Sequence, residues 1–168
     1  MRLETERTLL EPMSLDLMNG VIENNACSLR ISGYRIHNEW PENDLKEAIP
    51  VFRELLIRNG MNGFNNWTIS LKENATIIGS AGFIGNPDKN GMIEIGFGIV
   101  PAMRARGFCY EAVRALMKWA ISGEAIRGIL AHCNDDNIPS KNIIAKLGFT
   151  LTKDENGLLE WLYSNFPG

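Results

Sequence analysis

The chain has 168 residues, 45% of them hydrophobic, which fits one domain with a buried core. Its 20 acidic and 17 basic side chains give a net charge of -3, which provides no general attraction for nucleic acid or anionic lipid and mildly favours a cationic partner. The N-terminus is charged where a signal peptide needs an apolar segment, and no run approaches the roughly 18 apolar residues of a membrane span, so we expect a cytoplasmic protein.

The cysteine pattern argues against a disulfide scaffold and against a metal site. Cys27, Cys109 and Cys133 are odd in number and lack Cys-x-x-Cys spacing. Only His37 and His132 could join them as metal ligands. We therefore predict neither a structural disulfide nor a bound metal.

The N-terminal part of the chain is predicted to begin with a strand and a helix. Residues 8–13 are a short strand candidate. Ser14 is a suitable N-cap for a helix that extends to Ile22, because its side chain can accept a hydrogen bond from the first helical turn. Residues 27–31 are expected to be extended.

A loop and a second helix follow. Residues 33–43 are interpreted as a loop that borders a pocket, since the residue before Pro41 avoids the helical region. Apolar side chains at helical spacing predict a helix over residues 42–58, kinked at Pro50. This segment either closes over a substrate or has a purely structural role, and the sequence leaves both open.

Three consecutive antiparallel strands are predicted next. Residues 67–72 alternate between apolar and polar side chains, and a short turn connects them to a second strand over residues 76–84. A long polar turn at residues 86–91 leads into a mostly apolar strand over residues 93–100. The first two strands form a hairpin, and the third continues the meander.

A helix over residues 107–122 comes after the meander and leads into a strand over residues 127–133. This strand carries few charges, so we expect it to be buried and parallel to the strand before the helix. A loop begins at Asn134, and a short helix over residues 139–147 follows it, with a proline in its first turn and a glycine at its end.

A closing hairpin of residues 149–152 and 158–163 completes the predicted elements. Their order describes an α+β domain with a mixed sheet rather than a doubly wound one. If the two central strands are parallel, the turn at residues 104–109 and the loop at residues 134–140 lie at their C-terminal ends, where open sheets bind ligands. No repeat or linker is found, so residues 1–168 are predicted to form a single domain.

The turn between the apolar strand and the helix carries an unusual charge pattern. Acidic side chains normally lie at a helix N-terminus, which has partial positive charge, yet Arg104 and Arg106 stand there. They add repulsion unless an anion occupies the turn, and Gly107 lets backbone amides approach that anion closely. We infer a phosphate-bearing ligand; the alternative is that both arginines are solvated surface residues.

Two motifs carry a resemblance to a known family. Arg104-Ala-Arg-Gly-Phe-Cys109 resembles the Arg/Gln-x-x-Gly-x-Gly/Ala signature of the GNAT superfamily of acetyl-CoA-dependent N-acetyltransferases. Asn137-Ile-Pro-Ser140, followed by Lys-Leu-Gly-Phe149, is similar to a second segment of the ribosomal-protein N-terminal acetyltransferase branch. The resemblance implies a GNAT-like α+β fold, with a mixed, mostly antiparallel sheet of about seven strands flanked by about four helices and splayed centrally to form the cofactor slot.

The resemblance also implies acetyl-CoA as co-substrate, with its pyrophosphate on the turn at residues 104–109 and its pantetheine arm paired with the strand backbone. The cofactor-binding residues expected from it are Phe97, Gly98, Ile99, Val100, Arg104, Ala105, Arg106, Gly107, Phe108, Cys109, Asn137 and Asn142. A backbone N–H of Phe97 or Ile99 is expected to face the developing oxyanion. Gly96 and Gly98 fit a close approach by another chain, although glycines that only relieve crowding are the alternative.

Two residues depart from the family pattern. Cys109 stands where the family has Gly or Ala, and we expect a weaker or slightly shifted cofactor contact. Ile144 stands where many relatives carry a tyrosine that protonates the leaving thiolate. Ser140 is our candidate for that role, with an ordinary helix-capping residue as the alternative.

The acceptor amine must lose a proton before it attacks, and Glu94 is the candidate base, acting through water. The alternative is that Glu94 only points to solvent. Asn137 is either a pantetheine ligand or a turn former. His132 and Cys133 are interpreted as packing residues, as is Trp40 in the core or a pocket wall.

The expected reaction is acetyl transfer to a primary amine, either a small molecule or a protein N-terminus. Two rival hypotheses remain open: a non-catalytic acyl-CoA-binding module, and a dimerising interaction domain that uses the apolar strands. The sequence also leaves a homodimer open for the enzyme itself. The acceptor is expected to be shaped by residues 18–63, which contain no specific motif.

Overall fold

The computed structural model of the protein describes residues 1–24, 35–123 and 125–164. The strands in this part of the chain are β1 (Leu3–Glu4), β2 (Thr8–Pro12), β3 (Arg35–Ile36), β4 (Asn66–Leu71), β5 (Thr76–Phe83), β6 (Met92–Ile99), β7 (Gly128–Asn134), β8 (Thr150–Glu155) and β9 (Leu158–Ser164). The helices in the same part are α1 (Leu15–Ile22), α3 (Asn43–Asn59), α4 (Phe108–Ile121) and α5 (Ile138–Lys146), with a 3-10 turn η1 (Pro101–Met103).

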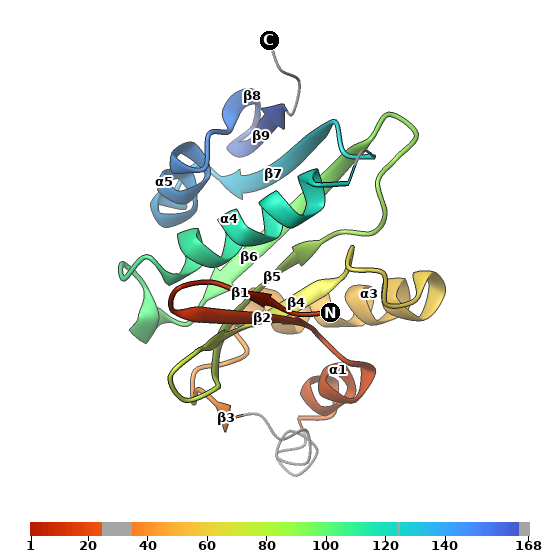
Figure 1. Cartoon of the computed structure of the whole chain (residues 1–168). Coiled ribbons are helices and arrows are strands. Elements are labelled where there is room, and N and C mark those ends of the chain that lie inside the picture. The colour runs from red at the N-terminus through yellow and green to blue at the C-terminus, as the bar shows by residue number, and fades with distance from the viewer. Residues whose placement is uncertain (25–34, 124, 165–168) are drawn as a thin grey trace.

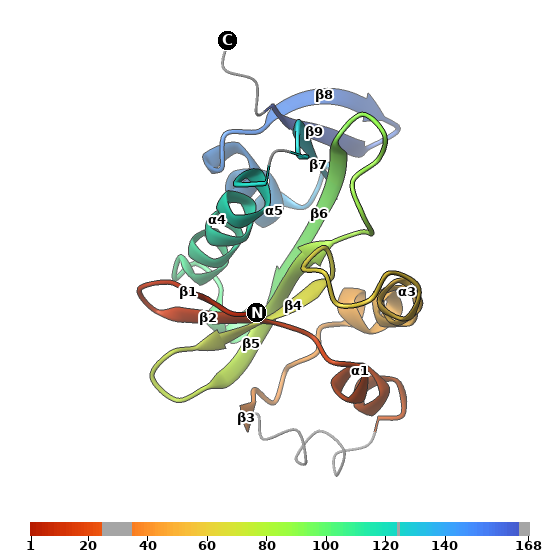
Figure 2. The same cartoon turned by 45° about the vertical axis from the view of Figure 1, so that its right-hand side comes forward.

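The strands form one mixed sheet in the order β1-β2-β4-β5-β6-β7-β9-β8, with β3 pairing beside β5 (Figure 1). Among the described strands, only the β6–β7 and β3–β5 pairs are parallel. Helices α4 and α5 cover one face, and α1 and α3 cover the other (Figure 2). The predicted α+β class and mostly antiparallel sheet are confirmed.

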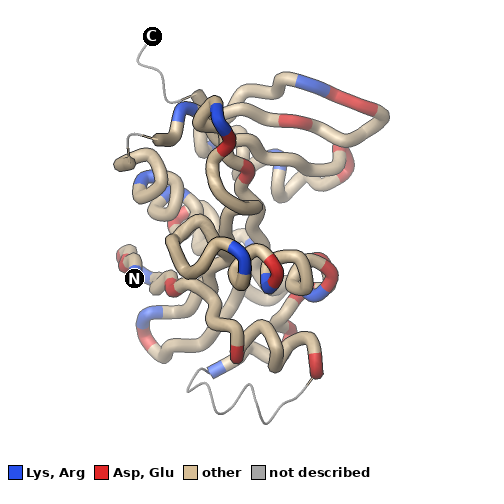
Figure 3. Tube along the Cα trace, turned by 90° about the vertical axis from the view of Figure 1, so that its right-hand side faces the viewer, with Lys and Arg blue, Asp and Glu red and all other residues tan. Residues whose placement is uncertain are grey.

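Periodicity explains why these segments fold as they do. In α4 the apolar side chains recur at helical spacing, and Ala112, Val113 and Leu116 are fully buried against the sheet. In β6 the residues alternate, so Ile93 and Ile95 are buried while Glu94 points to the other face. Charged residues of both signs are interspersed along the chain on the side of α1 and α3 (Figure 3).

The strand count differs from the expected seven because two very short strands join the sheet. Leu3–Glu4 pairs with β2, and Arg35–Ile36 pairs in parallel with the start of β5. The prediction of a loop over residues 33–43 is therefore wrong at β3, where two residues are too few to produce a periodic signal. The predicted extended segment at residues 27–31 lies outside the described residues.

The second helix runs through its proline. Pro50 lies inside α3, which extends from Asn43 to Asn59 as one element. A proline there removes the bond that its amide would donate to Lys46 O, but packing of the apolar face holds the remaining turns. Among the described residues, every helix is too short or too polar to cross a lipid bilayer.

The central feature of the sheet is the divergence of β6 from β7. The two strands are paired over three positions, from Met92 opposite Gly128 to Glu94 opposite Leu130. Beyond Glu94, β6 pairs with β5 alone, and β7 pairs with β9 alone. The strands visibly separate toward their C-terminal ends, where α4 begins (Figure 1). The predicted central splay is thus present.

The short strand β3 positions the segment that precedes α3. It pairs with Thr76 and Ile77, just beyond the part of β5 that β6 covers. The amide of His37 continues this pairing by donating to Ile77 O at 3.0 Å. Residues 37–42 are thereby held beside the C-terminal end of β6, opposite the face that α4 covers.

Candidate active site

A turn with unused backbone amides stands where the sequence predicts an anion site. In the described parts of the chain, no acceptor receives the amide hydrogens of residues 105–110, and the first helical bond runs from Glu111 N to Gly107 O. Ala105 and Gly107 have positive φ angles of 57° and 81°. Backbone that alternates in this way turns successive amides toward one concave site, and a left-handed alanine is strained. The turn has the backbone shape of a phosphate site.

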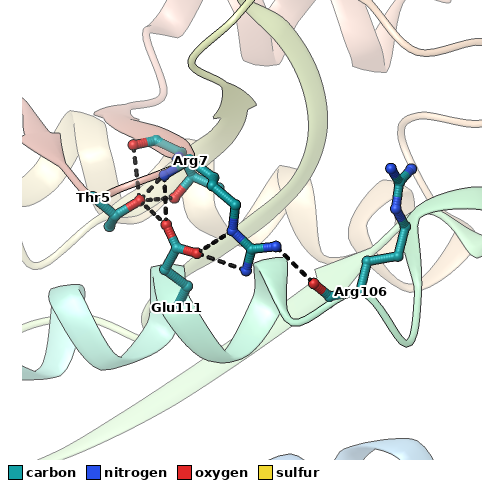
Figure 4. Close-up of polar contacts among 5 residues, drawn as sticks. Thr5, Arg7, Arg106 and Glu111 are labelled. Atoms are coloured by element: carbon teal, nitrogen blue, oxygen red, sulfur yellow. Dashed lines mark hydrogen bonds and ion pairs between the residues drawn. The ribbon is translucent and has the colours of Figure 1, made fainter.

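An acidic residue does occupy the first turn of α4, which the charge argument from the sequence overlooked. Glu111 accepts hydrogen bonds from the Thr5 hydroxyl and from Arg7 N, the latter at 2.7 Å. It also pairs with the Arg7 guanidinium, whose Nη2 lies 2.7 Å from Glu111 Oε2. Arg7 Nη1 in turn donates to the carbonyl of Arg106 at 3.0 Å (Figure 4). The β1–β2 connection therefore braces the turn.

The two arginines of the motif have different surroundings. Arg104 Nε donates to Ile99 O at 3.1 Å, so this side chain is directed to the end of β6. Arg106 lies over the Phe108 ring, with its guanidinium carbon 5.3 Å from the ring centroid, and stays exposed. Both precede α4 rather than lying in its first turn, and Arg7 is the third guanidinium beside this turn.

The backbone of β6 offers free groups to the diverging side. Val100 N donates to Ile78 O, so this amide is directed to β5. Because backbone groups alternate in direction along a strand, those of Phe97 and Ile99 are directed away from β5. The register thus supports the predicted direction of these two amides.

Some expected contacts along this strand are already used within the protein. Val100 O accepts from Met103 N at 2.9 Å, so both backbone groups of Val100 are bonded. Ile99 O accepts from Arg104. The N–H groups of Phe97 and Ile99 and the carbonyl of Phe97 are therefore the groups left for a ligand at the splay.

The two glycines of β6 have different surroundings on the face opposite α4. A Cβ placed on Gly96 would meet nothing within 4 Å. A Cβ placed on Gly98 would lie 3.3 Å from Glu42 Oε1. At Gly96 we therefore favour close approach by a ligand over relief of crowding within the protein. The reason is that no protein atom would contact a side chain placed there.

Glu94 belongs to a row of titratable side chains on the same face. His132 Nδ1 donates to Glu94 Oε1 at 2.8 Å, and His132 Nε2 lies 3.5 Å from Glu160 Oε2. Hydrogen bonds from Thr152 and Lys153 lower the pKa of Glu160 below its ordinary value. The interpretation of His132 as a packing residue is wrong, because β7 turns this position to solvent; Cys133 beside it is buried.

The residues predicted on α5 are assembled at its N-terminus. Asn137 is the N-cap, and its side-chain oxygen accepts from Ser140 N at 3.2 Å. The Ser140 hydroxyl has no hydrogen-bond partner among the described residues, and Asn142 is exposed. Asn137 thus has the turn-forming role, which leaves its NH₂ group available. Ile144 is buried in the core, and its aliphatic side chain has no proton to donate.

Cys109 points inward from α4 and packs in the core. Burial, together with the charge of Glu42, raises the pKa of the Cys109 thiol to about 12, although Arg104 opposes the shift. A thiol with this pKa is protonated at neutral pH and is a poor nucleophile. The departure from the family pattern is therefore a change in packing beneath the turn.

Glu42 is the site residue that sequence reasoning missed. It is the N-cap of α3, but its side chain makes no capping bond. Both carboxylate oxygens are buried and have no hydrogen-bond partner in another described residue. Burial raises the pKa of Glu42, and the hydrogen bond from its own backbone amide and the charge of Arg104 act in the opposite direction. A glutamate directly after Trp40-Pro41, where Ser, Asp or Asn is usual, was the only signal.

A pocket of about 460 Å³ opens beside Glu42. Its lining comes from the segment before α3, from the first turn of α3, and from Pro101 and Arg104 at the end of β6. The prediction that the loop before α3 borders a pocket is confirmed, and Trp40 is buried in its wall as expected.

Comparison with known proteins agrees with this geometry. The acetyltransferase (GNAT) domain family matches residues 7–150. The chain is 41% identical to the uncharacterized N-acetyltransferase YjdG of Bacillus subtilis (strain 168) over 162 residues, which is 96% of each protein.

Two solved structures share the fold at low sequence identity. One is RimL, a ribosomal L7/L12 alpha-N-protein acetyltransferase in complex with coenzyme A, with a TM-score of 0.67, 17% identity and 98% coverage of both chains. The other is a chimera of the spermidine N-acetyltransferase SpeG from Vibrio cholerae and hSSAT, with a TM-score of 0.66, 13% identity and coverage of 94% and 95%. From the family match and the 41% identical relative, the chain belongs to the GNAT family of acetyltransferases.

Proposed function

We propose that this GNAT enzyme transfers an acetyl group to a primary amine, carried by a small molecule or by a protein N-terminus. The relative in Bacillus subtilis is named an N-acetyltransferase. The structural neighbours are named for a protein N-terminus and for spermidine, so both kinds of amine occur on this fold. Because the matching family and the relative are both acetyltransferases, we favour an enzyme over the two rival hypotheses, a non-catalytic acyl-CoA-binding module and an interaction domain.

Acetyl-CoA is the co-substrate, and it supplies an activated acetyl group as a thioester. The residues present fit it, because the unpartnered amides of residues 105–110 suit a pyrophosphate. Phe97 and Ile99 have free amides at the splay for an amide-rich arm, and Asn137 has a free NH₂ group near the end of β7. The divergence of β6 from β7 beside this turn is the observation that carries the proposal.

The protein's own groups divide the chemistry between them. A backbone N–H of Phe97 or Ile99 faces the carbonyl oxygen and stabilises the negative charge that develops there. Glu94 receives, through water, the proton that the ammonium group gives up, and the freed nitrogen lone pair forms the new C–N bond. As the C–S bond breaks, Ser140 donates a hydrogen bond to the departing sulfur, which takes up the second proton released by the attacking nitrogen and leaves as a thiol.

His132 is proposed to assist Glu94. Its ring stands between Glu94 and Glu160, at 2.8 and 3.5 Å, in a carboxylate–imidazole–carboxylate row. Such a row fixes the orientation of the Glu94 carboxylate and provides a path by which a proton can leave it.

A cytoplasmic location is also proposed, supported by Cys109 and Cys133, which are both free thiols among the described residues.

The proposal is tested first by calorimetry with acetyl-CoA and then by CoA release with a panel of primary amines. Binding together with turnover on at least one amine is expected. Tight binding without turnover on any amine would contradict catalysis, and no binding would contradict the cofactor site as well. Glu94→Gln should lower kcat with little change in acetyl-CoA affinity, and an unaltered rate would remove Glu94 from the base role.

Gly96→Ala is a matched steric probe. The added Cβ meets no protein atom within 4 Å, so the fold should tolerate it. If acetyl-CoA or the amine occupies that space, the variant should keep its melting temperature and lose at least tenfold in kcat/KM. Full activity would show that the space beside Gly96 is not used.

A further inference from the structure

The pocket beside α3 has the size and the charge of a site for a small cation. Its volume of about 460 Å³ lies within the range of ligand sites. Three carboxylates line it, from Glu39, Glu42 and Asp44, against two cationic side chains, Lys46 and Arg104. Arg104 already donates to Ile99 O, which reduces its capacity to bind a further anion.

Among these carboxylates, Glu42 is the one whose oxygens are buried without a partner in another described residue. Glu39 Oε2 accepts from Ala102 N at 3.0 Å, so this side chain links the segment before α3 to η1. Asp44 is exposed to water in the first turn of α3. Both oxygens of Glu42, in contrast, are removed from water and accept no hydrogen bond from another described residue. Burying an acidic group without donors is costly, and a bound donor removes that cost.

The position of Glu42 relative to β6 places it at the splay. Its Oε1 would lie 3.3 Å from a Cβ on Gly98, so the carboxylate stands over the strand between Phe97 and Ile99. The free amides of these two residues border the same point. Glu94 lies four residues earlier, roughly 13 Å along the strand, and its carboxylate is bonded to His132. Glu42 therefore lies nearer than Glu94 to the free amides of Phe97 and Ile99.

We propose that this pocket is the acceptor site, and that it takes a primary amine in its cationic form, with the ammonium group bound to the carboxylate of Glu42. The inference rests on the proposed acetyl transfer and specifies its acceptor as a basic amine. The ammonium donates to the unpartnered oxygens and compensates their desolvation. Trp40 Nε1, which is buried without an acceptor, offers a second contact to a substrate oxygen. Glu42 is thus a residue of substrate recognition, distinct from the proposed base Glu94.

The experiment compares Glu42→Gln with the control Glu47→Gln, which removes an exposed carboxylate of α3 that does not line the pocket. Cadaverine serves as the cationic amine, and 4-methylaniline, which is uncharged at pH 7.5, serves as the neutral one. Glu42→Gln should raise KM for cadaverine at least tenfold and change KM for 4-methylaniline less than threefold. Glu47→Gln should change either KM less than threefold, and neither variant should alter the Kd for acetyl-CoA.

Amine binding is also measured directly, by NMR titration of the CoA-loaded protein with cadaverine. Binding that weakens tenfold or more in Glu42→Gln supports the acceptor site even if no acetyl transfer is detected, in which case only the proposed reaction fails. Equal cadaverine affinity in the wild type and in Glu42→Gln would overturn the inference. A parallel loss with 4-methylaniline would also overturn it, because charge recognition would then be absent.

Discussion

Two buried ionisable groups beside the splay have different roles. Glu42 and Cys109 both lie near the splay, and desolvation raises the pKa of each. The consequences differ. A buried carboxylate without a partner is stabilised by any hydrogen-bond donor that binds to it, whereas a buried thiol stays protonated and only packs against its neighbours. Residue identity alone does not distinguish these roles, since both depend on what surrounds the side chain.

Replacing Glu42 by Gln should stabilise the free protein. Its folded pKa is raised, so the folded state holds the proton more tightly, and the unfolding free energy falls as pH rises from the ordinary carboxyl range through the folded pKa. At pH 7 the variant should gain on the order of 1 kcal/mol, or roughly 2–4 °C in Tm. This gain in stability should vanish below about pH 4, where Glu42 is protonated in both the folded and the unfolded state. Thermal unfolding at pH 7 and pH 4 measures this, and a Tm at pH 7 equal to or below the wild type contradicts it.

The Cys109 thiol should resist alkylation in the folded protein. Burial and a pKa of about 12 leave almost no accessible thiolate at pH 8. Mass spectrometry after iodoacetamide treatment should find Cys109 unmodified until denaturant is added. Cys109→Ala is the control, and it should leave the number of rapidly alkylated thiols unchanged. Modification of Cys109 in buffer would contradict its placement in the core.

At the scale of elements, the start of α4 is held from outside its own helix. Thr5 and Arg7 come from the connection between β1 and β2, more than a hundred residues away from Glu111 in sequence, and Arg7 reaches on to the carbonyl of Arg106. The turn that presents the amides of residues 105–110 is thereby fixed before any ligand arrives. Preorganised donors bind an anion with less ordering cost than mobile ones.

The clamp between Arg7 and Glu111 should couple stability to acetyl-CoA binding. Arg7→Ala and Glu111→Ala are each expected to destabilise the protein by about 1 kcal/mol and to weaken acetyl-CoA binding about three- to tenfold. The double variant should lose less than the sum of the two. Urea unfolding and calorimetry provide the numbers, and fully additive losses would show that the two side chains act independently.

This clamp also has a predicted pH dependence. Burial acts to raise the pKa of Glu111, but the hydrogen bonds from Thr5 and Arg7 and the Arg7 charge outweigh it, so the pKa is lowered. A lowered carboxyl pKa contributes stability that is present above the ordinary range and is lost as pH falls through the folded pKa. The stability difference between the wild type and Glu111→Gln should therefore be largest near pH 7 and shrink toward pH 3. A difference that grows in acid would contradict this assignment.

At the scale of the whole molecule, the two parts of the sheet are joined by a short parallel contact. Only three residue pairs connect the described strands β6 and β7, and α4 packs on β6 beside this junction. A Cβ on Gly128 at this contact would lie 2.8 Å from Met92 Cε, so the end of the Met92 side chain would have to shift to admit it. The same divergence that opens the ligand site thus limits the pairing between the two parts.

We predict that residues 1–168 nevertheless unfold as one domain. The core cluster is continuous across β6, α4 and β7, so calorimetry should show a single transition with equal van't Hoff and calorimetric enthalpies. Acetyl-CoA at about 100 times its Kd should add roughly 2.7 kcal/mol and shift that transition as a whole. Two transitions, with only one responding to acetyl-CoA, would show that the parts unfold separately. The homodimer stays a prediction that light scattering can test.

Sequence reasoning worked best where the signal is local. The helix after the Arg104–Cys109 motif, predicted over residues 107–122, is Phe108–Ile121 in the structure, and the splay expected from the family resemblance is present. The motif residues are assembled at the C-terminal ends of β6 and β7 as predicted. The argument from the charges of Arg104 and Arg106 was incomplete. It did not foresee that Glu111, in the first turn of α4, forms an ion pair with Arg7 from a distant part of the chain.

By itself, the sequence determined the element order, the α+β class and the amide-rich turn, because periodicity, capping residues and a glycine motif act over a few neighbouring residues. Only the tertiary structure decided the partners of the polar side chains. It joined His132 to Glu94, turned Arg104 to Ile99, and brought Glu42 to Gly98 through the two-residue strand β3. The physical reason is that burial and electrostatic pairing depend on distances between segments far apart in the chain, and no local pattern encodes those distances.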